Sequence, residues 1–255
     1  MNKKIIAFLV LLSAVGTMIY SGSYLMAAEK VYQEGNAVYE DLSSRVKEYT
    51  TVDTTAAQEN MIDIPAKVYI PDIGINFDIL KTISKDAAAW LYCEGTVIDY
   101  PVMKADDYAY YLNHLPDGTY NLNGSLFTDY NNAPDFSDPL TVIYGHHMKS
   151  GSMFGSLKGY KEQKYFDEHP YMYLYTEQGN YRIDLLYGCL IGAGQWRERA
   201  FMYKENLDAL LAYAAQNTTF ESNAVYSETD KVIAMSTCSY EFEDARYVVI
   251  GILRK

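Results

Sequence analysis

Cys238 and Arg246 are the residues of this sequence whose types and spacing could most directly carry out covalent chemistry. Cys238 ends an apolar run at residues 232–237, and Arg246 precedes a second, β-branched run at 247–253. Two such runs with a polar, acidic segment between them predict a β-hairpin that places the thiol and the guanidinium side by side at one rim of a sheet. A guanidinium offers a rigid fork of donors that can hold an oxyanion or a substrate carbonyl. An ordinary hairpin with a buried cysteine and a surface arginine fits the same stretch.

Two adjacent histidines could supply a base. His146 and His147 follow an apolar run at 140–144 and Gly145, which can turn sharply, so either could present an imidazole at a sheet rim. A lone loop histidine such as His169 is more typical of solvated surface. An imidazole or a guanidinium near a thiol favours the reactive thiolate, and the three groups together describe acyl transfer through a thioester. The distance in sequence is no obstacle, because the members of a catalytic triad meet in space.

The other two cysteines are predicted to be structural. Cys93 and Cys189 lie in apolar, strand-like runs and are expected to be small buried hydrophobes. With three cysteines in the chain, at least one thiol stays free even if these two were paired. No cysteine and histidine cluster has the spacing of metal ligands, so a structural zinc site is not expected.

Length and composition indicate a globular chain that does not bind nucleic acid. The 255 residues can form one good-sized domain with an appendage, and 49% hydrophobic residues with 26 Tyr are ample for a core. The formal net charge of −12 argues against a nucleic-acid partner, because phosphate backbones select for Lys and Arg.

The N-terminal stretch has the length of a membrane span. Residues 5–28 carry no charge, and a helix of 24 residues would span ~36 Å, enough for a bilayer core of ~30 Å. Two lysines before the stretch and Glu29 after it place the N-terminus inside and the rest of the chain outside. A cleaved signal peptide, with Ser21 and Ser23 as the small residues of its cleavage site, is the alternative. The stretch is longer than a typical signal-peptide core, so we expect an uncleaved, single-pass anchor at 1–28.

The rest of the chain divides into a helical connection and a folded domain. Residues 29–49 have one apolar helical face and are predicted to form a helix that packs on the domain, and residues 50–60 form a polar linker. Residues 29–60 are therefore the spacer and linker, and residues 61–255 are the folded domain.

Strand patterns dominate this domain. Short apolar or β-branched runs are separated by turn residues, at 67–70, 73–77, 90–93, 96–103, 125–129, 140–144, 171–176 and 181–191. Helical patterns occur at 78–89 and 205–216. Many short strands, few long helices and no alternation of strand with helix predict a mainly β protein, either a barrel or a sandwich with added helices.

Three separated motifs resemble those of one enzyme family. Residues 234–238, AMSTC, are similar to the TLxTC signature of sortases, the cysteine transpeptidases of Gram-positive cell envelopes, and the spacing from Cys238 to Arg246 also matches. Residues 128–155, TDYNNAPDFSDPLTVIYGHHMKSGSMFG, resemble the class B segment in which the catalytic His follows Tyr-Gly and precedes a Lys-x-Gly-x-Met-Phe run. Residues 90–102, WLYCEGTVIDYPV, resemble the class B strand pattern ending Ile-Asp-Tyr-Pro-Val.

The resemblance to class B sortases covers roughly residues 64–253 and implies both a fold and a site. The fold is a closed β-barrel of about eight strands with N-terminal helices and a helix inserted before the cysteine strand. The resemblance implies that Cys238 would be the nucleophile and that His146 would be the general acid and base, because the family's histidine directly follows the glycine. Arg246 would hold the scissile carbonyl and its oxyanion. Ser236, two residues before Cys238 and so on the same face of the strand, is expected to line the substrate pocket.

The function implied by the resemblance is a two-substrate acyl transfer outside the cell membrane. A membrane-anchored enzyme would cleave a sorting motif near the C-terminus of secreted proteins, form a thioester at Cys238 and pass the acyl group to a peptidoglycan amine, with no metal or organic cofactor. Departures from the pattern at Ala234, Met235 and residues 93–94 leave the pocket's shape open. A secreted cysteine peptidase that uses water as acceptor, or an anchored binding module with an inert Cys238, are the alternatives.

Overall fold

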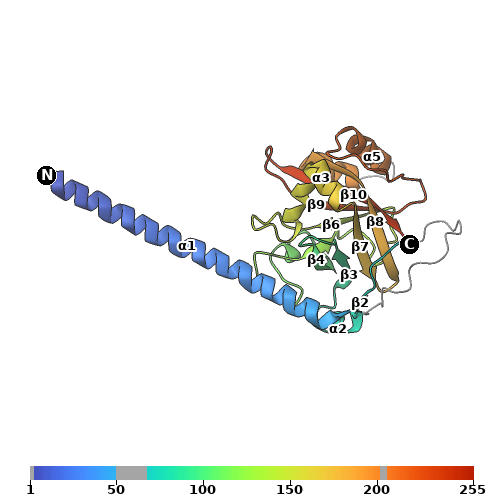
Figure 1. Cartoon of the computed structure of the whole chain (residues 1–255), viewed down its shortest axis with the longest axis horizontal. Helices are drawn as coiled ribbons and strands as arrows, with labels where there is room; N and C mark the ends of the chain where they lie inside the picture. The colour runs from blue at the N-terminus through green and yellow to red at the C-terminus, as the bar shows by residue number, and fades with distance from the viewer. Residues whose placement is uncertain (1–2, 50–67, 202–205) are drawn as a thin grey trace.

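Eight strands close into a barrel in the computed structural model, which describes residues 3–49, 68–201 and 206–255 (Figure 1). They are β3 (Ala87–Tyr92), β4 (Asp99–Lys104), β5 (Leu126–Thr128), β6 (Leu140–Tyr144), β7 (Tyr171–Thr176), β8 (Gly179–Gly192), β9 (Val232–Cys238) and β10 (Ala245–Arg254). Around the barrel their order is β10–β8–β7–β3–β4–β5–β6–β9. The β4–β5 and β6–β9 pairs are parallel and the others are antiparallel. The mainly β, closed eight-stranded barrel is therefore confirmed, and the sandwich is excluded.

Successive side chains of a strand point alternately into the barrel and toward an outer face that helices cover. On β9, Ile233 and Met235 belong to the interior cluster, whereas Val232 and Ala234 pack in a second cluster. That second cluster includes the buried Trp196 of α4 (Ala193–Phe201) and residues of α5 (Asn206–Gln216). The helix predicted at 205–216 is confirmed over its described residues, and α4 is an element that the sequence did not indicate.

One predicted helix is wrong over its second half. Residues 78–89 were expected to be helical, but α2 (Phe77–Ile83) ends where the backbone N–H of Ser84 bonds the carbonyl of Leu80. The alanines that follow form the start of β3, with Ala87 opposite Met103 and Ala89 opposite Val102. Alanine favours helix in isolation, but burial in the barrel wall overrides a propensity worth only fractions of a kcal/mol.

The long N-terminal helix joins the barrel at its C-terminal end. α1 (Lys3–Val46) extends away from the barrel in Figure 1 and packs Tyr39, Leu42 and Val46 as buried residues. The Tyr39 hydroxyl donates to the carbonyl of Gly124 at 2.5 Å. A short strand, β1 (Lys47–Tyr49), then pairs with β2 (Ile73–Ile75). The predicted packing of a helix from this region on the domain is confirmed, but the proposed linker at 50–60 and the start of the domain at 61 lie outside the described residues.

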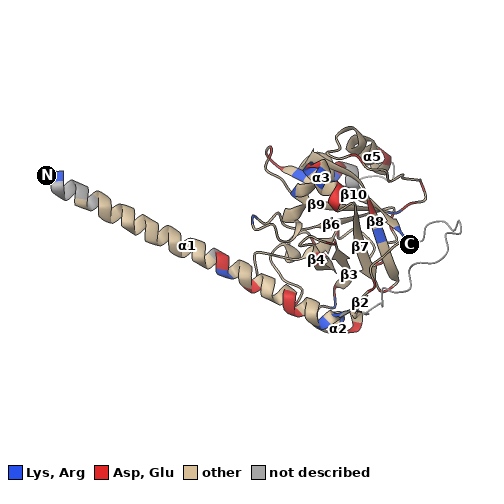
Figure 2. Ribbon diagram, viewed as in Figure 1, with Lys and Arg blue, Asp and Glu red and all other residues tan. Residues whose placement is uncertain are grey.

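The exposed half of α1 has the length and composition of a membrane-spanning helix. Within the part of the chain that the structure describes, α1 is the one helix long and apolar enough to cross a membrane, judged by length and composition. The sequence has no charged residue between Lys4 and Glu29, and in Figure 2 the described part of this stretch is tan up to the first red and blue segments along the helix. The remaining helical segments are short: η2 (Tyr110–Leu112), η3 (Phe154–Lys161) and α3 (Gln163–Glu168).

Candidate active site

The thiol of Cys238 and the guanidinium of Arg246 project from neighbouring positions on β9 and β10. The two residues are directly opposed in the antiparallel register. Cys238 is exposed at the end of a strand whose six preceding residues are all buried, and Arg246 is half-buried. One arginine nitrogen, Nη1, donates to the carbonyl of Ala245 at 3.0 Å, which leaves most of the guanidinium donors available. The hairpin predicted from the sequence is confirmed.

A cavity of about 320 Å³ opens beside this pair. Its lining includes all four residues singled out in the sequence: Cys238, Arg246, His146 and Ser236. Because side chains two apart share a face of a strand, Ser236 and Cys238 continue the helix-covered face of β9. The cavity therefore lies on the outer face of the barrel next to α4, which contributes Trp196 and Arg197 to its wall.

His146 is held by a backbone carbonyl at the edge of this cavity. Its Nε2 lies 2.6 Å from the carbonyl oxygen of Leu112, in η2. A carbonyl oxygen can only accept, so Nε2 carries the proton and Nδ1 is the nitrogen able to exchange one in the neutral ring. Among the described residues, no hydrogen bond joins His146 to the Cys238 sulfur. The two groups thus share a cavity without a preformed ion pair.

His147 has a different environment from its neighbour. Its Nδ1 lies 2.7 Å from the backbone carbonyl of Cys238, and its ring centroid is 5.2 Å from that of Tyr240. The cavity lining includes His146 and not His147. Of the two adjacent histidines, the structure brings His146 into the cavity and ties His147 to the main chain of the cysteine.

Gly145 sets the direction of the histidine pair by close packing. Gly145 does not have a positive φ, so left-handed backbone is not the reason for glycine at this position. Instead, a Cβ at this position would collide with the side chains of Leu126 and Phe154. The Phe154 backbone N–H donates to the carbonyl of His146 at 3.0 Å, so a larger residue at 145 would displace the segment that carries the imidazole.

A buried polar group behind the cavity was not found from the sequence. The fully buried carboxylate of Asp129 accepts a hydrogen bond from the hydroxyl of Tyr144, a cavity residue, at 3.0 Å. Burial, with the negative charge of Asp129 as a further cause, raises the pKa of Tyr144 well above its ordinary value. Tyr144 is therefore a neutral donor fixed in the wall. By contrast, Ser236 lines the cavity, but its hydroxyl is buried and has no hydrogen-bond partner among the described residues.

Comparisons with known proteins agree on one family. No model of a known protein family matches the chain. The sortase B of Listeria monocytogenes is 33% identical over 178 residues, which cover 68% of this chain and 72% of that protein. The crystal structure of Clostridium perfringens sortase B aligns with a TM-score of 0.65 and 28% identity, covering 70% of this chain and 100% of the other. Sortase B from B. anthracis shares the fold, with a TM-score of 0.69 and 23% identity over 89% of this chain and 99% of that one.

The barrel, its exposed cysteine and these relatives define the class: this chain is a cysteine transpeptidase of the sortase type. Within that class it belongs to the sortase B family.

Proposed function

We propose that the chain is anchored in the cell membrane by α1 and transfers sorting-motif peptides from secreted proteins to an amine of peptidoglycan through a thioester on Cys238. The observation that carries the proposal is the meeting of an exposed thiol, a guanidinium and an imidazole at one cavity. These are the nucleophile, the oxyanion donor and the proton carrier that acyl transfer needs.

In the first half-reaction the Cys238 thiolate attacks the scissile carbonyl carbon of the sorting motif. Negative charge develops on the carbonyl oxygen, where the Arg246 guanidinium donates hydrogen bonds to it. His146, as imidazolium, gives its proton to the departing amine when the C–N bond breaks. The products of this step are a thioester on Cys238 and the free C-terminal fragment.

In the second half-reaction the acceptor amine attacks the thioester carbonyl. His146, now neutral, takes the proton from the attacking nitrogen, and Arg246 again holds the oxyanion. The C–S bond breaks, an amide forms and the thiolate is restored. The single histidine can serve both halves because each half leaves it in the protonation state that the next requires.

The membrane anchor supports a transfer rather than a hydrolysis. An acceptor attached to a membrane lipid and an enzyme held on the same surface share a high effective concentration, an advantage that water as acceptor does not need. The long uncharged stretch of α1 is consistent with such an anchor.

Product analysis tests this proposal. The full chain, in detergent or lipid vesicles, is incubated with a panel of peptides that vary the sorting motif and with a panel of peptidoglycan stem or cross-bridge amines. We expect the right amine to raise total turnover and to divert the product from free acid to amide, as measured by mass spectrometry. Free acid at an unchanged rate with every amine would identify a peptidase instead.

A further inference from the structure

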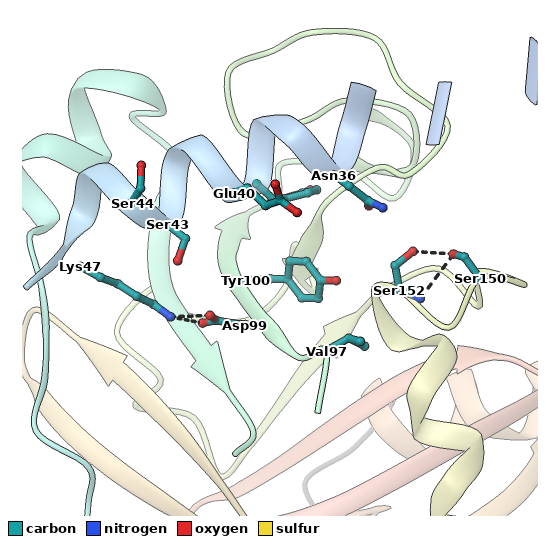
Figure 3. Close-up of a pocket in the computed structure, with 11 residues that line it drawn as sticks. Asn36, Glu40, Ser43, Ser44, Lys47, Val97, Asp99, Tyr100, Ser150 and Ser152 are labelled. Carbon is teal, nitrogen blue, oxygen red and sulfur yellow. Dashed lines mark hydrogen bonds and ion pairs between the residues drawn. The ribbon is translucent and has the colours of Figure 1, made fainter. Parts of the chain in front are cut away.

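A second and larger cavity, of about 650 Å³, lies between α1 and the barrel (Figure 3). Its volume is within the range of ligand-binding sites. Three segments supply its polar and apolar lining: the last turns of α1, the approach to β4, and the loop that follows the histidine pair. The residues that matter here are Asn36, Glu40 and Ser43 of α1, Tyr100 of β4, and Ser150 and Ser152 of the loop. In Figure 3, Tyr100 lies in the middle of this groove, with Glu40 of α1 above it and the two loop serines to one side.

The charges in the groove argue against an anionic ligand. Lys47 is its one cation within the described residues, and its ammonium bonds both carboxylate oxygens of Asp99. Asp99 also accepts from the Trp90 indole at 2.7 Å, so this ion pair is satisfied internally. Glu40 is exposed and has no ion pair in the described part of the chain. Lys and Arg are the side chains that bind phosphate and pyrophosphate most strongly, and the described lining offers neither in unpaired form.

The remaining groups suit a neutral, polyhydroxylated ligand. The serine hydroxyls, the Asn36 amide and the Glu40 carboxylate place both donors and acceptors along the groove. The Ser150 and Ser152 hydroxyls bond each other at 2.8 Å, and the Asn36 side-chain oxygen accepts from Asn123 at 3.3 Å, so a ligand would share these groups with the protein. Val97, 49% exposed, adds an apolar rim, and Tyr100 forms the floor. A sugar ring presents the matching combination, with hydroxyls at its edge and C–H groups on its face.

The groove is connected to the nucleophile by a short chain of contacts. The Tyr100 hydroxyl accepts from the backbone N–H of Met153 at 3.2 Å, and Met153 forms a β-bridge with His147. His147 in turn bonds the carbonyl of Cys238. The loop at 147–153 therefore borders the groove through its serines and reaches the end of β9 through His147.

The groove also lies at a distance from the membrane that the headgroup of a membrane lipid could reach. If α1 leaves the bilayer along its normal, Asn36 and Val46, the last residue of α1, lie roughly 12 Å and 27 Å beyond the last residue of the uncharged stretch, at 1.5 Å per residue. A headgroup attached to a lipid of the same membrane would reach this zone.

We propose that this groove binds the glycan of the peptidoglycan acceptor, so that the amine of its peptide reaches over the loop at 147–153 to the thioester. The inference rests on the proposed function, since it names the partner that the second half-reaction uses.

The test compares two acceptors of the full chain: a stem or cross-bridge peptide amine alone, and the same peptide attached to its disaccharide. For the unaltered enzyme we expect the disaccharide to lower KM about tenfold with little change in kcat. Glu40→Ala and Val97→Trp, which remove a polar partner and fill the rim, should bring the ratio of the two KM values close to one. Asp41→Ala removes a carboxylate from the same helical turn outside the groove lining and should preserve the tenfold ratio.

The possible results distinguish a failure of the glycan site from a failure of the proposed function. Equal KM values for the two acceptors, or a tenfold ratio that survives in both groove variants, would overturn the glycan site while leaving transpeptidation intact. Absence of amide with either acceptor would overturn the proposed function and this inference with it. Calorimetric titration of the disaccharide alone into the full chain carrying Cys238→Ala gives a readout that does not depend on turnover: binding is expected, and it should be lost when Val97→Trp is added.

Discussion

Nδ1 of His147 lies 2.7 Å from the backbone carbonyl oxygen of Cys238, so the residue next to the proposed base supports the main chain of the proposed nucleophile. The carbonyl oxygen only accepts, which makes His147 the donor through Nδ1. The two adjacent and chemically identical side chains thus have different surroundings, because His146 and not His147 lines the cavity beside Cys238.

The two histidines should therefore respond differently to removal. A neutral hydrogen bond contributes about 1 kcal/mol, so His147→Ala is expected to lower kcat/KM by no more than about fivefold. His146→Ala removes the general acid and base and should cost about 10²–10⁴-fold. The measurement is the steady-state rate on one sorting peptide, with thermal unfolding as the control for folding. The opposite ranking would show that the base has been assigned to the wrong histidine.

Arg246 should not tolerate replacement by lysine. The guanidinium can offer two donors in one plane to an oxyanion, whereas an ammonium is a point charge on a flexible stem. Loss of an oxyanion-hole donor typically costs about 10²–10³-fold, so the acylation rate of Arg246→Lys should fall by that order. Single-turnover cleavage measures this step directly. Acylation at the unaltered enzyme's rate would mean that Arg246 contributes only its positive charge.

The three cysteines should differ sharply in reactivity. Cys93 and Cys189 are fully buried, and burial raises the pKa of the Cys93 thiol and raises that of Cys189 to about 12. Cys238 is exposed. Iodoacetamide at neutral pH should add one label to the folded chain, at Cys238, and three labels in denaturant; the folded Cys238→Ala variant should take none. Labelling of Cys238 no faster than of the buried pair would favour an inert thiol and a binding module.

The stabilisation that the loop between β9 and β10 gives to the folded chain should decrease in acid. The ammonium of Lys161 and the hydroxyl of Ser239 bond the Glu241 carboxylate and lower its pKa from 4.5 to about 2. Because the folded pKa lies below the unfolded one, this stabilisation is complete above about pH 4.5 and is lost as the pH falls toward 2. Glu241→Gln should therefore lower Tm more at pH 6 than at pH 3, whereas Glu243→Gln on the same loop should have little effect at either pH. A Tm difference independent of pH would contradict this.

Strand patterns were sufficient to predict a mainly β fold, and the resemblance to class B sortases was needed to choose the closed barrel over a sandwich. The runs at 140–144 and 171–176 coincide with β6 and β7, because buried strands bounded by turn residues leave a clear local pattern. The start of β3 was missed because its alanines carry no strand signal, and only their opposition to Val102 and Met103 makes them a strand. α4 was missed because one buried tryptophan among polar residues gives no helical period.

For the candidate site, too, features that depend on residues close in sequence could be predicted, and features that depend on distant residues could not. The hairpin that opposes Cys238 and Arg246 is local, and the sequence predicted it. The choice of His146 over His147 came from the family resemblance, since it depends on contacts with Leu112 and with the distant end of β9. Asp129 could not have been found, because its partner Tyr144 becomes a neighbour only when β5 and β6 pair.

The most direct test of the account is the covalent intermediate on Cys238. The full chain is mixed with a cleavable sorting peptide in the absence of amine, quenched in acid and analysed by intact-mass and peptide-mapping mass spectrometry. We expect a mass increase equal to the acyl fragment, located on Cys238, absent from Cys238→Ala and discharged when the acceptor amine is added before the quench. Cleavage of the peptide by Cys238→Ala, or an acyl group on any other residue, would contradict the account.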